Sequence, residues 1–259
     1  MKPSTIGGIN NLPENEKREI YMRVVPRGLI ERFHLPAPDS QRIKSFTRFK
    51  FAPGSSDVEL SLFHEERFAD PILYGHLTDT LNGQIHILLY IMNDPASPRY
   101  NVDVTADGIT TKFGTLRRNL EAEAAALSDN LAPGQIRRGL SMLSEAMDTF
   151  EKFVKYLGHE IYFVEPLYYH NAIIFERHGF TYQEGRRFME RIQTGFSAGG
   201  DLLPRLDNSP FRQPAATNSI RLRSWAIHDG ILGEPFTSVT MYKRVGKSAG
   251  INTCPDVAW

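Results

Sequence analysis

The stretch from His159 to Tyr182, HEIYFVEPLYYHNAIIFERHGFTY, indicates the order of elements around which the chain is expected to fold. It opens with β-branched and aromatic residues at Ile161–Val164, a composition that is typical of a short buried strand. Pro166 has no backbone N–H and therefore ends the strand. From Asn171 the apolar residues follow helical spacing, and Gly179 ends the helix because glycine tolerates a positive φ. The stretch predicts a strand, a polar elbow, a short helix and a second strand.

The helix of this stretch carries the pattern Asn171-Ala172-x-x-Phe175-Glu176-Arg177-x-Gly179-Phe180. This pattern resembles a late segment of the acyl-CoA-dependent GNAT acyltransferases. In that family the strand before the helix parts from its neighbour and admits the pantetheine arm of the cofactor. The resemblance implies that Asn171 and Phe175 lie beside that arm. An ordinary junction between a strand and a helix, ended by glycine, is the alternative explanation of the same residues.

The composition of the 259 residues is that of a globular protein, with 41% hydrophobic and 23% charged residues, enough for one large domain or two small ones. Lys+Arg and Asp+Glu balance at 30 each, so neither nucleic acid nor a membrane is an expected partner. The single Cys254 excludes an intramolecular disulfide and a cysteine-based zinc site. No apolar run approaches the roughly 20 residues that span a bilayer, and no apolar signal core stands at the N-terminus, so a cytoplasmic protein is expected.

The centre of the chain predicts antiparallel strands joined by short turns. Asn82-Gly83 between two strand-like runs is a strong signal for a tight hairpin. Residues 42–51 fit either a strand or a basic amphipathic segment. The runs that read as strands, by alternation or by continuous apolar character, are 58–62, 71–80, 84–92, 100–105 and 237–245.

Two helices are predicted between these strands. Residues 116–130 are rich in Ala, Glu and Leu, which are strong helix formers. From Leu140 to Leu157 apolar residues recur at helical spacing, and Gly158 follows as the end of that helix.

The order of sheet, turn, helix, strand and helix is that of the GNAT core. The expected fold is therefore α+β, with a central mixed, mostly antiparallel sheet flanked by helices. Residues 1–56 are expected to form an N-terminal extension, and residues 57–259 the acyltransferase domain. An insertion at about 185–236 precedes the last strand, and it either shapes an acceptor pocket or serves as a dimer arm.

A glycine-containing turn precedes the second predicted helix. Backbone N–H groups at a helix N-terminus bind phosphate, and glycine lets the ligand approach closely. The turn departs from the family pattern, because its glutamine stands one residue too far from the glycine and a serine replaces the small final residue. Its two arginines can supply charge directly, or they can be ordinary surface residues. The residues expected to bind the cofactor here are Gln135, Ile136, Arg137, Arg138, Gly139, Leu140 and Ser141.

Acyl transfer to an amine needs a base that accepts the amine proton and often an acid that protonates the departing thiolate. Glu165 and His170 are the candidate bases, and Tyr168 or Tyr169 is the candidate acid. The family's usual acid is a tyrosine at the position of Phe175, and phenylalanine cannot donate a proton. Either a neighbouring tyrosine substitutes, or the chain has lost the reaction. For His170, a packing or capping role at the helix start is the alternative.

A cluster of Arg221, Arg223, Trp225 and His228 follows a proline-rich loop. These side chains either line an acceptor pocket or support the insertion as a buried hydrogen-bonded cluster. Histidines with carboxylates can also ligate a metal. No two histidines stand at the i, i+4 spacing of common zinc motifs, however, and no metal ligand is assigned.

The resemblance implies transfer of an acetyl or longer acyl group from acyl-CoA, used as a substrate, to an amine of a small molecule or protein. Two other classes stay open. One is a non-catalytic GNAT-like protein that binds CoA or another ligand, or regulates a partner. The other is a metal-dependent enzyme that uses the histidines. A homodimer is compatible with the sequence.

Overall fold

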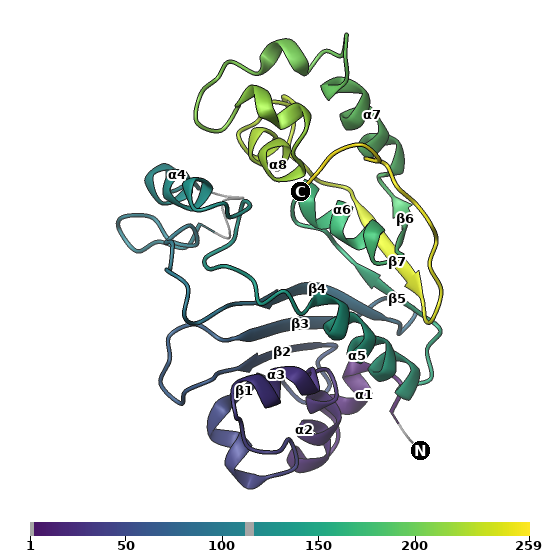
Figure 1. The fold of residues 1–259 in the computed structure, drawn as a ribbon. Helices are drawn as coiled ribbons and strands as arrows, with labels where there is room; N and C mark the ends of the chain where they lie inside the picture. The colour runs from purple at the N-terminus through teal and green to yellow at the C-terminus, as the bar shows by residue number, and fades with distance from the viewer. Residues whose placement is uncertain (1–2, 112–116) are drawn as a thin grey trace. The chain divides into compact units, whose positions relative to one another are not determined.

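The computed structural model describes residues 3–111 and 117–259, and these form an α+β protein (Figure 1). The chain divides into two compact units. Unit 1 comprises Met1–Ala96, Gly139–Glu165 and Tyr242–Ser248. Unit 2 comprises Ser97–Arg138, Pro166–Met241 and Ala249–Trp259.

The described residues form seven strands, most of them antiparallel, in the order β1-β2-β3-β4-β5-β7-β6. The strands are β1 (Thr47–Lys50), β2 (Asp57–Leu62), β3 (Leu73–Asp79), β4 (Ile85–Met92), β5 (Ile161–Val164), β6 (Thr181–Glu184) and β7 (Thr240–Arg244). The α-helices are α1 (Ile6–Asn10), α2 (Glu14–Met22), α3 (Arg27–Arg32), α4 (Leu120–Ser128), α5 (Leu143–Tyr156), α6 (Tyr169–Arg177), α7 (Arg186–Phe196) and α8 (Ile220–His228). The 3-10 helices are η1 (Gln41–Phe46), η2 (Leu203–Arg205) and η3 (Pro214–Thr217).

The sheet of unit 1 is built from the predicted central strands. Alternate residues of β2, Val58, Leu60 and Leu62, are buried, as expected for a strand with one covered face. The predicted hairpin between β3 and β4 is confirmed, because the Thr80 amide donates to the Gln84 carbonyl at 2.8 Å. β1 to β4 pair antiparallel, whereas β4 and β5 pair parallel.

The N-terminal residues are tied into this sheet. The backbone N–H groups of Ile6 and Gly7 donate to the Asp79 carboxylate at 2.7 and 2.8 Å. The Asn10 side-chain amide donates to the carbonyls of Ser55 and Asp57 at 2.6 and 3.0 Å. Residues 3–56 therefore belong to the same compact unit as β2 to β4.

Helix α5 is the long amphipathic helix of unit 1 and packs beside β5 (Figure 1). The ring of Phe150 lies 5.3 Å from that of Tyr162 in β5. In the first turn of α5, the Glu145 carboxylate accepts a 2.7 Å hydrogen bond from the Gly28 amide in the first turn of α3. Glu145 thereby links the first turns of two helices, where a negative charge is favourable.

The core of unit 2 joins α4 to α8. Trp225 of α8 is fully buried, and its indole N–H donates to the Leu131 carbonyl at 2.8 Å. The buried apolar residues around it are Val102, Ala126, Leu127, Leu131 and Ile136. Arg223 is buried as well, with its guanidinium bonded to the carbonyls of Ala216 and Thr217. The cluster predicted around residues 221–228 is thus in part a buried support for the 185–236 segment.

Several predicted boundaries are corrected by the structure. Residues 100–105 form no strand, and only an isolated bridge joins Val104 to Thr110. The basic segment 42–51 divides into η1 and β1. Helix α4 spans Leu120–Ser128 rather than 116–130, and residue 116 lies outside the described residues.

Two helix starts also differ from the prediction. Helix α6 begins at Tyr169, two residues before Asn171, and ends before Gly179, which has the expected positive φ of 85°. Helix α5 begins only at Leu143. The turn from Gln135 to Arg138 therefore does not open α5, because four residues, 139–142, stand between Arg138 and Leu143.

Candidate functional site

In unit 1 the parallel strands β4 and β5 pair only over a short distance. Their ladder contains His86↔Phe163 and Ile87↔Val164, and the Glu165 amide donates to the Ile87 carbonyl over a long 3.4 Å. β5 then ends, whereas β4 continues through Met92 paired with β3. After Ile87, the edge of β4 that faces β5 therefore has no further ladder pairs with β5.

A β-bulge falls at the same place. Ile87 and Leu89 of β4 pair with the consecutive β3 residues Leu77 and His76, so Leu88 is an extra residue on β4. A bulge bends the strand that carries it and increases its local twist. The strand changes direction where its pairing with β5 stops.

The half of β4 beyond the bulge is apolar and partly exposed, from Leu88 to Met92. The strand also carries two buried polar atoms, His86 Nε2 and Tyr90 Oη, that have no hydrogen-bond partner among the described residues. Burial, with Glu145 nearby, raises the pKa of the Tyr90 phenol, which therefore keeps its proton. Buried polar groups normally have a partner, so a ligand or water is expected beside this strand.

The chain re-enters unit 1 next to the end of β4. A Cβ atom placed on Gly139 would lie 3.7 Å from the Met92 carbonyl oxygen. Leu140 is buried and Ser141 is exposed, and α5 starts two residues after Ser141. The N-cap of α5, Met142, gives no side-chain hydrogen bond to the first turn of the helix.

The cation beside this turn is Arg32 of α3, which the sequence reasoning did not identify. Its guanidinium donates to the Leu140 carbonyl at 3.1 Å, and the side chain is otherwise exposed. Nothing in the sequence links residue 32 to residue 140, so this pairing could not have been found from spacing.

Gln135 to Arg138 lie in unit 2, where they form a local hydrogen-bonded turn. The Gln135 side chain accepts from the Ala132 amide at 2.7 Å, and the Ile136 carbonyl accepts from Tyr100 at 2.8 Å. The Arg137 guanidinium donates to the Ser97 carbonyl, and Arg138 is exposed. The predicted cofactor turn is therefore divided between the two units, with only Gly139, Leu140 and Ser141 next to α5.

Unit 2 contains a cleft of about 490 Å³. Its walls come from the start of α6, the inner face of α8 and the loop that follows α8. Ser224 and His228 are four residues apart on α8 and therefore share one helix face. The polar and aromatic residues that line the cleft are Tyr168, Tyr169, Ser224, His228, Glu234 and Phe236.

His170, a predicted base, is buried behind this cleft. Its Nδ1 lies 2.9 Å from the Ser224 hydroxyl, and its ring stacks 5.6 Å from that of Tyr168. Burial, with a smaller effect of His228, lowers the pKa of His170 to about 3. An imidazole that stays neutral so far into acid is a poor proton acceptor, so the packing alternative fits His170 better than the role of base.

His228 has a different environment. Its Nε2 lies 3.2 Å from a carboxylate oxygen of Glu123, which is 1% exposed. Arg118 donates to the other Glu123 oxygen from Nε at 2.8 Å and from a terminal nitrogen at 2.6 Å. Burial opposes ionisation of Glu123, but the hydrogen bonds from His228 and Arg118 outweigh it and hold the pKa of the carboxyl below its usual value.

The structure also shows the surroundings of the other residues that the sequence predicted for the site. Burial raises the pKa values of Tyr168 and Tyr169, so both phenols stay protonated, and Tyr169 receives a hydrogen bond from Arg223. Glu165 is exposed at the end of β5. Asn171 is half-buried, and Phe175 packs against Phe180 at 5.0 Å.

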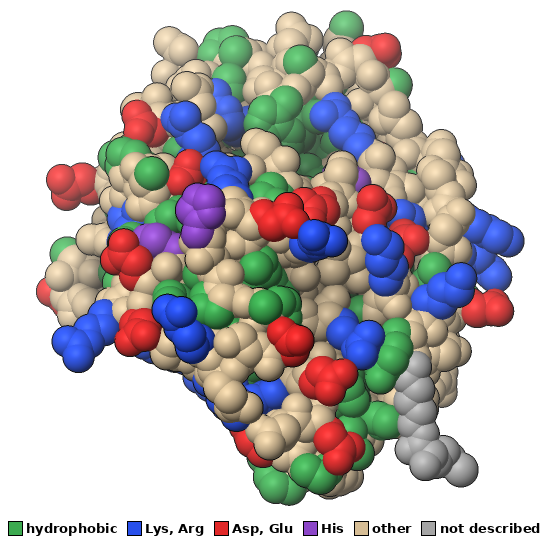
Figure 2. Space-filling view, turned by 60° about the horizontal axis from the view of Figure 1, so that its bottom comes forward, with side chains coloured by type: hydrophobic (Ala, Val, Ile, Leu, Met, Phe, Trp, Pro, Cys, Tyr) green, Lys and Arg blue, Asp and Glu red, His purple; other side chains and the backbone are tan. Residues whose placement is uncertain are grey.

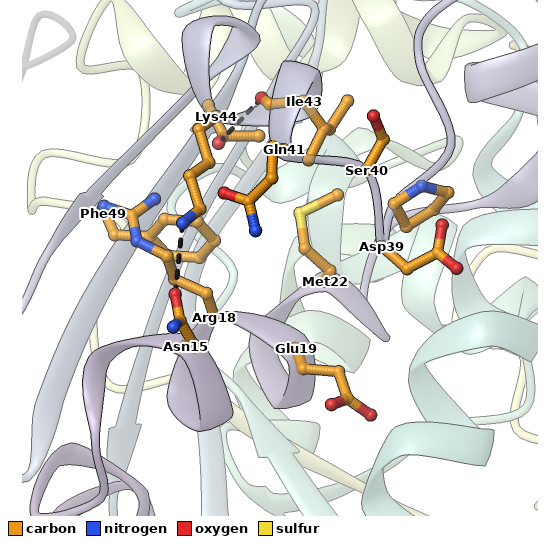
Figure 3. Close-up of a pocket in the computed structure, with 12 residues that line it drawn as sticks. Asn15, Arg18, Glu19, Met22, Asp39, Ser40, Gln41, Ile43, Lys44 and Phe49 are labelled. Carbon is orange, nitrogen blue, oxygen red and sulfur yellow. Dashed lines mark hydrogen bonds between the residues drawn. The ribbon is translucent and has the colours of Figure 1, made fainter.

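A second cavity, of about 300 Å³, lies between α2 and η1 in the N-terminal part of unit 1 (Figure 3). Figure 3 shows the Lys44 amine directed at the Asn15 side chain, at 3.1 Å. Arg18 pairs with Glu14 at 2.5 Å and lies over the Phe49 ring. Because both cations have neighbouring partners, this cavity is a weaker candidate for a ligand than the cleft of unit 2.

On the face shown in Figure 2, acidic and basic side chains are intermixed. No helix in the described ranges is long and apolar enough to cross a membrane. Within residues 3–111 and 117–259, no group of three His, Cys, Asp or Glu side chains is arranged to hold a metal ion. The metal-dependent alternative thus has no support in this part of the chain.

No family model, characterised protein or solved structure matches the chain. Its function is therefore inferred from its own residues.

Proposed function

We propose that the protein is an acyl-CoA-dependent acyltransferase that moves an acetyl or longer acyl group to an amine. The observation that carries this proposal is the parting of β4 from β5 after the pairs His86↔Phe163 and Ile87↔Val164. A strand side left outside a ladder presents backbone N–H and C=O groups that an extended ligand can pair with. The pantetheine arm of CoA is an extended chain with two amides and matches that requirement.

The other parts of unit 1 fit the two ends of the cofactor. The half-exposed apolar residues from Leu88 to Met92 offer a surface for the thioester end. The first turn of α5 offers backbone N–H groups to phosphate, with Ser141 exposed just before it and Arg32 beside it. The 171–180 segment resembles the GNAT family, and this resemblance also supports acyl-CoA as the ligand.

Calorimetry with acetyl-CoA, longer acyl-CoAs and free CoA tests the proposal. We expect binding by the wild-type chain. Arg32→Ala should weaken it more strongly at low salt, because charge contacts with phosphate are least screened there. Arg27→Ala is the matched control, an exposed arginine of the same helix α3 that pairs with Glu31 at 2.7 Å and should leave CoA affinity unchanged at any salt concentration.

The possible results separate the alternatives. No binding of any CoA form at high micromolar concentration would remove the acyltransferase proposal. Binding without turnover across a panel of amines would instead favour a non-catalytic CoA-binding protein, in keeping with the phenylalanine at position 175. An Arg32→Ala variant with wild-type affinity at low salt would show that the phosphates bind elsewhere.

A further inference from the structure

We propose that the cleft of unit 2 binds the acceptor as a cationic primary amine that carries no carboxylate, and that Nδ1 of His228 takes the proton of that amine. The reaction step rests on the acyl transfer proposed above. The binding site does not, because it follows from the residues of unit 2 alone.

The charge of the cleft selects a cation. None of the described residues that line it is Lys or Arg, and Glu234 is its one acidic side chain. Two guanidinium groups that bond to lining residues or to their partners are occupied: Arg118 by Glu123 and Asp229, and Arg223 by Gln193 and backbone carbonyls. A ligand carboxylate would find no positive partner here and would lose its hydration without compensation.

The remaining walls suit an amine with an aromatic or apolar body. The rings of Tyr169 and Phe236 stand edge to face at 6.4 Å, and Tyr168 forms another wall. Aromatic faces attract ammonium groups, and they also bury the carbon skeleton of the ligand. The Ser224 hydroxyl adds a polar contact on the same helix face as His228.

The tautomer of His228 follows from its partner. Glu123 is ionised and can only accept a hydrogen bond, so the Nε2 atom of His228 must carry the proton. The lone pair is then on Nδ1, which has no hydrogen-bond partner among the described residues. A buried carboxylate that fixes an imidazole in this way also stabilises the imidazolium that forms when the second nitrogen is protonated.

Several charged and titratable groups pack around His228. His170 from α6 stays neutral, and the Tyr168 phenol stays protonated. Asp229, beside His228 on the chain, is held by Arg118 and Arg212 at 2.6 and 2.7 Å. The charged and titratable groups are therefore Glu123 from α4, Arg118 from the segment before it, Tyr168 just before α6, His170 from α6, and Asp229 after α8.

The chemical step is balanced with acyl-CoA as the co-reactant. His228 Nδ1 takes one proton from the bound ammonium, and the free amine attacks the thioester carbonyl carbon. The new C–N bond forms and the C–S bond breaks. The second proton of the nitrogen passes to the departing thiolate, and the imidazolium returns its proton to solvent. The products are an amide, the CoA thiol and one released proton.

The binding claim is tested by calorimetry of the full chain with two matched probes, tyramine and tyrosine, which differ by one carboxylate. We expect tyramine to bind, tyrosine to bind at least tenfold more weakly, and Glu234→Gln to weaken tyramine. Equal affinity for both probes, or no binding of tyramine, would overturn the assignment of the cleft.

The proton-transfer claim is tested by steady-state kinetics with acetyl-CoA and tyramine. His228→Asn should lower kcat by about 10² to 10⁴, the usual contribution of a general base, with the KM for acetyl-CoA unchanged. His170→Asn, checked for folding by circular dichroism, is the matched control and should lower kcat far less than His228→Asn does.

Other results of these experiments would overturn all or part of the proposal. A His228→Asn variant with kcat within twofold of wild type overturns the role of His228, as does bound tyramine that is never acetylated by bound acetyl-CoA. Tyramine binding without any binding of CoA would overturn the proposed acyl transfer and the proton transfer with it, but would leave the amine site standing.

Discussion

His170 and His228 show how the surroundings of one side-chain type decide what it can do. Both lie near the same cleft of unit 2, and their rings flank Tyr168 at 5.6 and 5.5 Å. His170 has a neutral hydroxyl as its partner and is buried, so it remains uncharged. His228 has the buried carboxylate of Glu123 as its partner, at 3.2 Å from Nε2. The sequence offered Glu165 and His170 as candidate bases rather than His228, because only the fold brings Glu123 to His228.

The depressed pKa of His170 predicts a pH-dependent stability. The folded chain holds this histidine neutral down to a pKa of about 3, whereas the pKa of an exposed histidine is ordinarily about 6.5. Its contribution to stability is therefore complete above pH 6.5 and is lost as the pH falls below that value. The expected loss in the free energy of unfolding between pH 7.5 and 5 is about 2 kcal/mol.

Urea unfolding of the wild type and of His170→Asn at both pH values measures this loss. The asparagine variant cannot titrate, so its stability should fall by about 2 kcal/mol less than that of the wild type between the two values. Equal losses in both proteins would mean that His170 already takes up a proton in the folded state.

At the scale of elements, local sequence signals located the strands and helices that carry strong patterns. The alternation in β2, the Asn82-Gly83 turn and the β-branched run of β5 each specify their structure through neighbouring residues. The apolar and polar residues of 100–105 alternate equally well, yet this segment forms only one isolated bridge and no β-strand. Alternation predicts that a segment can be a strand, whereas a paired partner elsewhere in the chain decides whether it is one.

The candidate site was harder to predict, because its residues are distant in sequence. Glu123 and His228 are 105 residues apart, and Arg32 and Leu140 are 108 apart. The local signals for the cleft were the adjacent Tyr168 and Tyr169 and the cluster that contains His228. Ser224 and His228, four residues apart, share one face of α8. The division of the 135–141 turn between two units could not be read from its glycines and arginines.

The fit of Tyr168 in the wall of the cleft gives a prediction about Gly134. This residue has a φ of 78°, and a Cβ atom there would lie 2.4 Å from the Tyr168 ring. Gly134→Ala should therefore destabilise the protein by about 2–4 kcal/mol, through strain and collision together. The control is Gly233→Ala, where φ is 79° and no atom lies within 4 Å, so only strain of about 1 kcal/mol is expected.

Chemical denaturation of both variants measures the difference. In the double variant Gly134→Ala, Tyr168→Leu, the smaller side chain should remove the collision, so the two substitutions should not be additive. Additive effects, or the same cost at both glycines, would show that the Tyr168 ring does not rest on Gly134.

At the scale of the whole molecule, each unit carries one proposed binding surface, that of the acyl donor in unit 1 and that of the acceptor amine in unit 2. The donor surface is made by β4, β5 and the start of α5. The acceptor surface is made by α6, α8 and the loop after α8. The N-terminal residues are hydrogen-bonded to β3 in unit 1 and therefore help to hold the donor surface.

A ligand that binds only the folded chain must stabilise it by mass action. CoA at 100 times its Kd should add about 2.7 kcal/mol to the free energy of unfolding, and each further tenfold about 1.4 kcal/mol. Scanning calorimetry over a series of CoA concentrations should show Tm rising steadily. A Tm that stays constant up to millimolar CoA would speak against a cofactor site anywhere in the chain.

Amide hydrogen exchange at single-residue resolution, with and without CoA, tests the central claim most directly. If the cofactor lies along the side of β4 that β5 leaves open, exchange should slow at residues 88–92 and in the first turn of α5, and stay unchanged in β2. Unchanged exchange at residues 88–92 under saturating CoA would contradict the claim that CoA binds where β4 and β5 part.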